Sequence, residues 1–284
     1  MLRRILVPLD ESKLSESALP CALDLASRCQ AETALVQVTP HVALEAPGLP
    51  AETALHMQEE QLKHARRYLE QKSAPFAPRP VKLYTPVGRA SDEISRLAFE
   101  HGCDLILMCS HGRDHLARWL LGSVAEGVIR QAHCPVLLLR PATADHSLFR
   151  NIVVPSDGSA PSTAFLADLQ NYLAPGGQIT LLLSTGTSLS PEFGSMESYF
   201  QQVEGQLRQL QVHGKTLPLV VLRGEPADDI LSWSQNHACD LIAMSTHGRS
   251  GYRRFWLGSI TEKVARHATC PVLVFPHFRP PAEE

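Results

Sequence analysis

Short apolar runs alternate with longer amphipathic segments along the whole chain. Apolar runs of about four to eight residues are typical of buried strands, and apolar residues at helical spacing are typical of amphipathic helices. In the first half of the sequence, strands are predicted at Ile5–Asp10, Thr33–Val38, Val81–Thr85, Asp104–Cys109 and Pro135–Leu139. Helices are predicted at Ser12–Arg28, at Met57–Gln71, in a segment that opens at Gly88 and Ala90, and from about Ser123 to Gln131. The proline-rich segment Pro40–Leu55 is predicted to be a loop or a frayed helix start.

The same order of segments starts again at Asn151. Strands are predicted there at Asn151–Asp157, Ile179–Ser184, Leu217–Leu222, Asp240–Ser245 and Cys270–Phe275. Pro8 and Asp10 recur 147 positions later, whereas Gly112 and Gly122 recur 136 positions later. The constant offsets indicate a duplicated unit, and their difference of 11 residues predicts a surface segment of variable length between the first and fourth strands. We therefore expect domains at residues 1–141 and 150–277, a linker at 142–149 and a tail at 278–284.

Strands that alternate with helices of this length are typical of βαβ units, in which a parallel sheet carries helices on both faces. The predicted fold class is α/β, with two tandem, five-stranded, doubly wound domains of the Rossmann-like type. In such sheets ligands bind beyond the carboxyl ends of the strands, at the point where the strand order reverses. Strand one ends at Asp10 and strand four at Cys109, so these two ends meet if the strands are neighbours.

Composition and charge narrow the class of protein. A formal net charge of −3 and a sequence pI near 6.5 argue against a broad electrostatic surface for nucleic acid. The start of the sequence has no signal-peptide pattern, and no apolar run approaches the roughly 18–20 residues that span a bilayer. None of the seven cysteines forms a Cys-x-x-Cys pair. This usage favours reduced, mostly buried thiols and a cytoplasmic protein over a disulfide framework or a zinc site.

One motif follows the fourth strand in both copies. It reads Cys109-Ser-His-Gly-Arg113 with a later Gly122-Ser123, and Ser245-Thr-His-Gly-Arg249 with a later Gly258-Ser259. Nine residues separate the glycine of the turn from the glycine of the Gly-Ser pair in each copy. A glycine turn that leads into a helix N-terminus exposes backbone N–H groups and the positive end of the helix dipole. The motif therefore predicts a phosphate site.

Several side chains of the motif have alternative roles. Its two arginines could contact a phosphate or remain solvated surface charges. The serines of the Gly-Ser pairs could add a hydroxyl to the anion site, cap the helix, or do both. His111 and His247 are expected to pack in the turn, because no partner for acid–base chemistry accompanies them.

Asp10 and Asp157 stand at equivalent strand ends. A carboxylate there could accept hydrogen bonds from a ribose hydroxyl or an adenine amino group, or hold a metal through water. It could instead cap the next helix, since Ser12 and Ser159 follow. Because an acid recurs at the same place beside the predicted switch point, we favour the ligand role.

In combination, the strand-Pro-x-Asp ends, the glycine turns, the Gly-Ser pairs and the later Cys-Pro-Val-Leu resemble the universal stress protein family in its tandem two-domain form. The resemblance covers almost the whole chain. It implies domains that bind ATP or ADP, with a divalent cation such as Mg2+ or Mn2+. The cofactor-binding residues implied in the first copy are Pro8, Asp10, Val38, Cys109, Ser110, His111, Gly112, Arg113, Gly122, Ser123 and Val124. Those implied in the second copy are Pro155, Asp157, Ser245, Thr246, His247, Gly248, Arg249, Gly258, Ser259, Ile260 and Thr261.

The sequence departs from the family pattern at two places. The first glycine of the family motif is Cys109 in one copy and Ser245 in the other, so a Cβ is expected to face the ligand. The aliphatic residue expected on the second strand is Val38 in the first copy but Ser184 in the second. The second copy is therefore expected to have the poorer adenine wall.

Three functions stay open, and no catalytic residue is predicted. The favoured one is a nucleotide-binding, stress-response regulatory protein, in which slow ATP hydrolysis would need little dedicated machinery. The second is a nucleotide-free module for protein interaction and dimerisation. A nucleotidyl-transfer enzyme is least favoured, because Glu-Ser-Lys and Gly-Ser-Ala follow the first strands where a His-x-x-His or Ser-Gly-Gly loop would be needed. The resemblance also implies that the domains pair through their last strands as an internal pseudo-dimer, and that the chain forms a homodimer.

Overall fold

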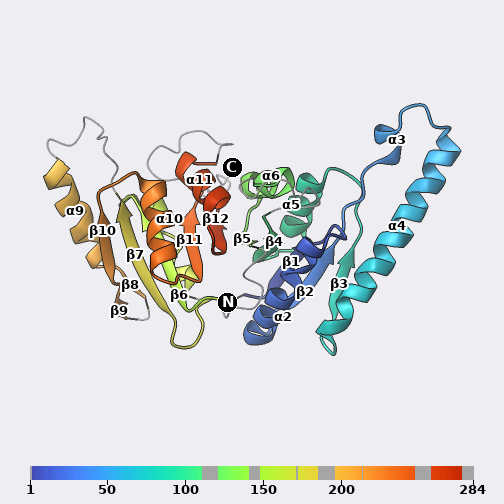
Figure 1. Cartoon of the computed structure of the whole chain (residues 1–284). Coiled ribbons are helices and arrows are strands. Elements are labelled where there is room, and N and C mark those ends of the chain that lie inside the picture. The colour runs from blue at the N-terminus through green and yellow to red at the C-terminus, as the bar shows by residue number, and fades with distance from the viewer. Residues whose placement is uncertain are drawn as a thin grey trace, which may run out of the picture. The chain divides into compact units, whose positions relative to one another are not determined.

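The computed structural model describes residues 2–110, 121–140, 148–170, 172–184, 196–212, 214–246 and 257–276. The chain divides into two compact units, Leu2–Ala144 and Asp145–Glu284, which we call the first half and the second half. Each half is a layered α/β unit, so the predicted fold class is confirmed (Figure 1). The division falls inside the predicted linker, and the exact domain limits stay a prediction.

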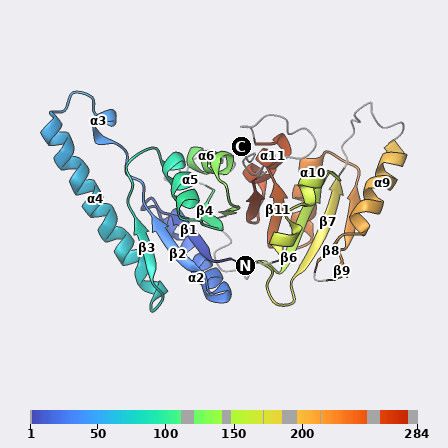
Figure 2. The ribbon, with the colours of Figure 1, turned by 180° about the vertical axis from the view of Figure 1, so that it is seen from behind.

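The sheet of the first half contains five parallel strands in the order β5-β4-β1-β2-β3 among the residues described. Their bounds are β1 Arg4–Pro8, β2 Glu32–Val36, β3 Val81–Tyr84, β4 Leu105–Cys109 and β5 Val136–Leu139. The helical elements are α1 Lys13–Glu16, α2 Ala18–Cys29, α3 Val42–Glu45, α4 Ala51–Ser73, the 3-10 turn η1 Ala74–Phe76, α5 Ala90–Glu100 and α6 Ser123–Gln131. Because right-handed crossovers lead away from β1 in both directions, α2 and α4 cover one face, and α5 and α6 cover the other (Figure 2).

The second half repeats this plan with the strand order β12-β11-β6-β7-β10, again all parallel in the part of the chain described. Its strands are β6 Asn151–Ser156, β7 Gln178–Ser184, β10 Leu219–Leu222, β11 Leu241–Ser245 and β12 Val272–Phe275. Its helices are α7 Ala160–Thr163, α8 Leu166–Leu169, α9 Met196–Arg208, α10 Pro226–Asn236 and α11 Ser259–His267. A short antiparallel pair, β8 Gln211–Val212 and β9 Lys215–Thr216, follows α9.

The central strands are apolar without alternation because helices cover both of their sides. Ile5, Leu6 and Val7 of β1 are fully buried, as are the three residues Leu105–Leu107 of β4. This continuous burial explains why the strands stand out so clearly in the sequence.

An aspartate just before the fourth strand ties that strand to the first in each half. Asp104 Oδ2 accepts the backbone N–H groups of Arg3 and Arg4, at 2.8 Å each. Asp240 Oδ2 accepts those of Arg150 and Asn151, at 2.9 and 2.8 Å. The same clamp therefore aligns the two strands whose far ends form the candidate site.

Two predicted helix limits were wrong. The helix predicted at Ser12–Arg28 is broken at Ser17, because Pro20 lacks the N–H that a continuous helix would need there, while a proline is tolerated in the first turn of α2. Helix α4 begins at Ala51 and not at Met57, inside the segment Pro40–Leu55 that was predicted as a loop or a frayed helix start. Pro50 provides the N-cap position, and its carbonyl accepts the N–H of Ala54. The early start makes α4 23 residues long, whereas its counterpart α9 has 13.

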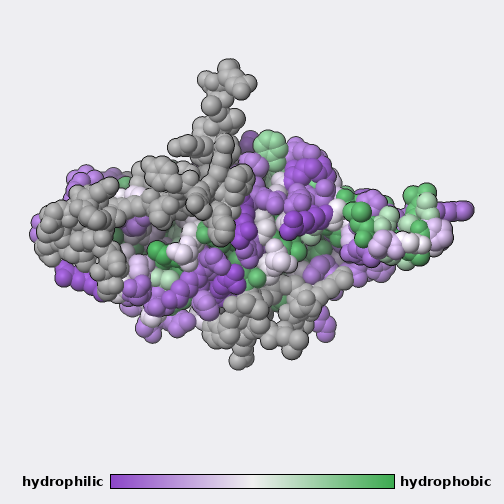
Figure 3. Space-filling view, turned by 90° about the horizontal axis from the view of Figure 1, so that it is seen from above, coloured by the Kyte–Doolittle hydropathy of each residue, from purple (hydrophilic) through white to green (hydrophobic). Residues whose placement is uncertain are grey.

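The added length of the first half carries apolar side chains to the surface. Leu44 of α3 is 79% exposed, and Leu55 and Met57 in the first turns of α4 are 63% and 43% exposed. Figure 3 shows hydrophobic side chains at this end of the first half. Helices α3 and α4, which carry these residues, do not contribute to the site described below.

Candidate functional site

The carboxyl ends of the first and fourth strands lie side by side in both halves. Strand β1 pairs with β4 through Ile5–Leu105 and Leu6–Ile106, and β6 pairs with β11 through Ile152–Leu241 and Val153–Ile242. The strand order reverses between these strands, so this edge is the switch point at which ligands of such sheets bind. In each half, the predicted residues at or just after the ends of these strands are thus brought to the same edge of the sheet. They are Pro8, Asp10, Cys109 and Ser110 in the first half, and Pro155, Asp157, Ser245 and Thr246 in the second.

The motif loop is closed at its base in both halves. The N–H of Gly122 donates to the carbonyl of Ser110 at 2.8 Å, and that of Gly258 donates to the carbonyl of Thr246 at 3.0 Å. A loop with such joined ends is typical of compact functional surface loops. The predicted residues His111, Gly112, Arg113, His247, Gly248 and Arg249 lie outside the described residues.

The helix after each loop starts without a side-chain cap. Gly122 and Gly258 are the N-caps of α6 and α11, and no capping hydrogen bond from a side chain is found at either position in the structure described. The alternative that Ser123 or Ser259 is the N-cap is therefore wrong. The first N–H groups of a helix have no acceptor within it, so this end of each helix can bind an anion.

The two aspartates adopt the same local geometry. Asp10 Oδ1 accepts the N–H of Ser12 at 3.1 Å and its hydroxyl at 2.5 Å. Asp157 Oδ1 accepts the N–H and hydroxyl of Ser159 at 3.0 and 2.5 Å. Ser12 in turn accepts the N–H of Ser15 as the N-cap of α1. Each carboxylate is therefore fixed in a defined orientation at the strand end.

Cys109, whose Cβ is expected to face a ligand, has its thiol buried against the end of α1. The side chain is buried, its Sγ donates to the carbonyl of Leu14 at 2.8 Å, and it lies 3.2 Å from the hydroxyl of Ser17. Burial raises the pKa of this thiol to about 11, with a smaller opposing effect of the Ser17 hydrogen bond. Because α1 ends at Glu16, the carbonyl and hydroxyl at this break are available to the thiol.

Sequence reasoning missed a buried cation beneath the first loop. Arg140 follows β5, is 7% exposed, and donates from Nη1 to the hydroxyl of Ser110 at 3.0 Å. The matching position of the second half is Pro276. The only sign of this buried cation in the sequence was an arginine directly after an apolar strand, at a position where the second copy has a proline. Arg140 places a positive charge at the base of the first loop, and Pro276 supplies none at the matching position of the second half.

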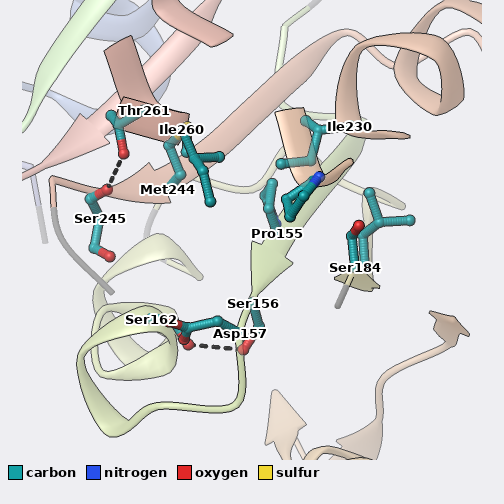
Figure 4. Close-up of a pocket in the computed structure, with 12 residues that line it drawn as sticks. Pro155, Ser156, Asp157, Ser162, Ser184, Ile230, Met244, Ser245, Ile260 and Thr261 are labelled. Atoms are coloured by element: carbon teal, nitrogen blue, oxygen red, sulfur yellow. Dashed lines mark hydrogen bonds between the residues drawn. The ribbon is translucent and has the colours of Figure 1, made fainter. Parts of the chain in front are cut away.

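A pocket of about 70 Å³ opens at the equivalent edge of the second half (Figure 4). Its apolar side is formed by Pro155, Leu182, Pro226, Ile230, Met244 and Ile260. Its polar side is formed by Ser156, Asp157, Ser162, Ser184, Ser245 and Thr261. The volume is well below the roughly 300–1,000 Å³ of a complete small-molecule site, so the pocket has room for only part of a ligand of that size.

The pocket includes residues that the sequence did not single out. Ser156, Ser162, Leu182, Pro226, Ile230 and Met244 come from five different elements and are close only in the folded chain. Val38, predicted for the first half, lies half-buried just after β2. Val124 and Ile260 occupy equivalent positions in the first turns of α6 and α11, and are 37% and 39% exposed.

Neither a metal-binding cluster nor a membrane-spanning helix is found among the described residues. They contain no group of three or more histidine, cysteine, aspartate or glutamate side chains arranged to hold a metal ion. Within these same ranges, no helix combines the length and the apolar character needed to cross a bilayer. All seven cysteines are free thiols, and four of them are buried.

Comparisons with known proteins agree with this architecture. The model of the universal stress protein family matches residues 1–140 and again residues 148–276. The chain is 36% identical over 146 residues to universal stress protein MJ0531 of Methanocaldococcus jannaschii, which covers 49% of this chain and 83% of that protein. It is 25% identical over 288 residues to universal stress protein Rv2623 of Mycobacterium tuberculosis, with 95% of each chain covered.

A solved structure matches both halves together. A universal stress protein from Archaeoglobus fulgidus has a TM-score of 0.71 at 21% identity, with 97% of this chain and 98% of that chain covered. At this identity the match supports the fold. The family resemblance seen in the motifs is confirmed by the double match of the family model. The chain therefore belongs to the universal stress protein family and carries two copies of its domain in tandem.

Proposed function

We propose that the chain binds ATP or ADP at the switch-point edge of one or both halves and acts as a regulatory protein in a stress response. One observation carries the proposal: both halves combine a loop closed by a backbone hydrogen bond, a helix N-terminus without a side-chain cap, and an oriented aspartate. The loop and helix suit the phosphates, and the carboxylate suits the hydroxyl or amino groups of a nucleoside.

In the first half, Pro8, Asp10 and Val38 would lie along the adenosine, and Ser110, Gly122, Ser123 and Val124 along the phosphates. The buried guanidinium of Arg140 beneath Ser110 adds a favourable charge there. In the second half the matching residues are Pro155 and Asp157, then Thr246, Gly258, Ser259, Ile260 and Thr261. A divalent cation would be held mainly by the phosphates, since the described residues supply no carboxylate cluster for it.

A nucleotide-free interaction module is the second candidate, and specific contacts favour it. Each aspartate already accepts two hydrogen bonds from the following serine, and the Cys109 thiol packs against the end of α1. These contacts would stabilise the turns without any ligand. Under this alternative the glycines serve only the loop geometry.

Isothermal titration calorimetry with ATP and ADP, with and without Mg2+, separates the two candidates. We expect binding by the unchanged chain, and at least about tenfold weaker binding at the affected site in Gly112→Val and Gly248→Val. Gly205→Val is the matched control, because Gly205 lies on α9 with no atom within 4 Å of the position of an added Cβ. No affinity of the unchanged chain for either nucleotide would reject nucleotide binding.

The remaining functional predictions can be tested with the same protein. Phosphate release during overnight incubation with ATP measures slow hydrolysis. Sedimentation velocity at several concentrations tests whether the chain forms a homodimer. The pairing of the two domains through their last strands also stays a prediction.

A further inference from the structure

The pocket of the second half differs in polarity from the matching positions of the first half. On the second strand of each half, Val36 pairs with Pro8 and Leu182 pairs with Pro155. Val38 and Ser184 each lie two residues further along, so Ser184 is the counterpart of Val38. Across the pocket, hydroxyl side chains replace others at four positions: Ser156 for Leu9, Ser184 for Val38, Ser245 for Cys109, and Thr261 for Ala125. The two halves therefore offer different chemistry at the same edge.

The protons of two pocket hydroxyls are already committed within the protein. A serine or threonine hydroxyl carries one proton and two lone pairs. Ser184 donates its proton to Asp229 Oδ2 at 2.6 Å. Thr261 donates its proton to the carbonyl of Ser245 at 3.0 Å, as Figure 4 shows. In the part of the chain described, no other group hydrogen-bonds to either hydroxyl oxygen. Each thus offers only lone pairs to the cavity.

The same holds for the second pair of hydroxyls. Ser162 donates to the carbonyl of Ser159 at 2.7 Å, so the proton in its 2.7 Å contact with Ser156 comes from Ser156. Ser156 also accepts the N–H of Gly158 at 3.0 Å. Asp157, when ionised, can only accept hydrogen bonds. These side chains of the polar side therefore offer acceptors to a ligand.

We infer that this pocket selects a nucleoside whose base carries an exocyclic amino group, as adenine does, and discriminates against one with a carbonyl oxygen in its place. The inference rests on the proposed function, that the second half binds a nucleotide. An amino group can donate a hydrogen bond to the hydroxyl oxygen of Ser184. A carbonyl oxygen can only accept hydrogen bonds, so it would be repelled by that oxygen. The apolar side of the pocket, including Leu182 and Ile230, suits the faces of the ring.

A site in the first half should prefer an amino group over a carbonyl oxygen less strongly. Leu9, Val38 and Ala125 have no polar side-chain atom with which to distinguish an amino group from a carbonyl oxygen. A site that hydrogen-bonds a polar group of its substrate rejects analogues that cannot make the bond far better than an apolar site rejects a near-isostere. The chain would then combine one selective site with one permissive site.

Calorimetric titration of the full chain with ATP and with ITP, which differ at this amino group, tests the inference. Asp10→Ala is expected to weaken nucleotide binding by the first half, so the binding that persists in this variant belongs to the second half. We expect that site to bind ATP at least about tenfold more tightly than ITP. Replacing Ser184 with the residue of the first half, in Ser184→Val, should bring the ratio of the two dissociation constants close to one. Ser184→Ala serves the same purpose without added bulk.

Ser234→Ala is the matched control, because Ser234 is a buried serine of α10 that donates to the carbonyl of Leu231 and does not line the pocket. Its ATP-to-ITP ratio should equal that of the unchanged chain. Equal affinity of the second half for ATP and ITP overturns this inference and leaves nucleotide binding intact. A tenfold ratio that persists in both Ser184 variants also overturns it. Absence of binding by either nucleotide overturns both this inference and the proposed function.

Discussion

The packing of α6 against α5 yields a prediction with a defined sign. A Cβ added at Gly127 of α6 would lie 2.6 Å from Cβ of Ser91 and 3.0 Å from its Oγ. Carbon atoms pack favourably at about 3.5–4.0 Å, so the added methyl group overlaps Ser91 by nearly 1 Å. Cβ of Ser91 cannot move away by rotation of the side chain. The two helices, or the start of α6 that borders the loop, must shift instead.

The magnitude follows from two opposing effects. Replacing a glycine with alanine inside a helix stabilises it by about 1 kcal/mol. Overpacking by one carbon costs about 1–3 kcal/mol. Because the overlap at Gly127 involves a rigid atom, we expect Gly127→Ala to lower the free energy of unfolding by about 1 kcal/mol. The same change at Gly205 of α9, where no atom lies within 4 Å, should raise it by about 0.5–1 kcal/mol.

Urea unfolding followed by circular dichroism, fitted with one transition for each half, measures both effects. The double-mutant cycle of Gly127→Ala with Ser91→Gly isolates the contact, and we expect a favourable coupling of about 1 kcal/mol or more. The reasoning is refuted if Gly127→Ala stabilises the chain as much as Gly205→Ala does. A coupling of zero in the cycle would refute it as well.

Three further predictions follow from the same structure. Because burial raises the pKa of Cys109 from 9.0 to about 11, its labelling by iodoacetamide at pH 8 should be at least about 100-fold slower in the folded chain than in urea. Similar labelling rates in the two states, measured by peptide mass mapping, would contradict this. Burial also raises the pKa values of Cys103 and Cys239 to about 11, so these thiols stay protonated in the folded chain at a pH at which they ionise in the unfolded chain. The free energy of unfolding should therefore fall between about pH 9 and 11, and a constant urea midpoint over this range would argue against it. Asp240→Ala should lower the free energy of unfolding by about 1–3 kcal/mol, because three backbone N–H groups lose their acceptor. The exposed Asp168→Ala should change it by less than about 0.5 kcal/mol, and equal effects of the two substitutions would show that the clamp is unimportant.

Burial periodicity was sufficient to predict the strands and the doubly wound fold. Continuous apolar runs such as Ile5–Val7 and Leu105–Leu107 occur only where both faces of a strand are covered, and the repeat showed the same order twice. The helix limits were less accurate because they depend on single residues. Pro20 breaks a helix that the apolar spacing alone would continue, and Pro50 sets the start of α4 inside a segment that was predicted as a loop or a frayed helix start.

The candidate site was predicted only where its residues follow the strand ends directly. Asp10, Asp157 and the loop ends belong to that group. Ser162, Ile230 and Met244 did not stand out, because their spacing indicates burial and not which cavity they border. The orientation of the Cys109 thiol could not be predicted either, since its acceptor, the carbonyl of Leu14, becomes available through the break at Ser17.

The hydrogen bond that joins the two ends of each motif loop also bears on how a duplicated chain can diverge. Ser110 and Gly122, like Thr246 and Gly258, join the two ends of a loop of eleven residues in each copy. Under the proposed function, substitutions within one loop would change what that copy recognises while the ends of the loop stay joined. After duplication, each half could then acquire its own recognition sequence on a shared framework. An exchange of residues 111–121 with 247–257 would keep both loop lengths and both closing hydrogen bonds.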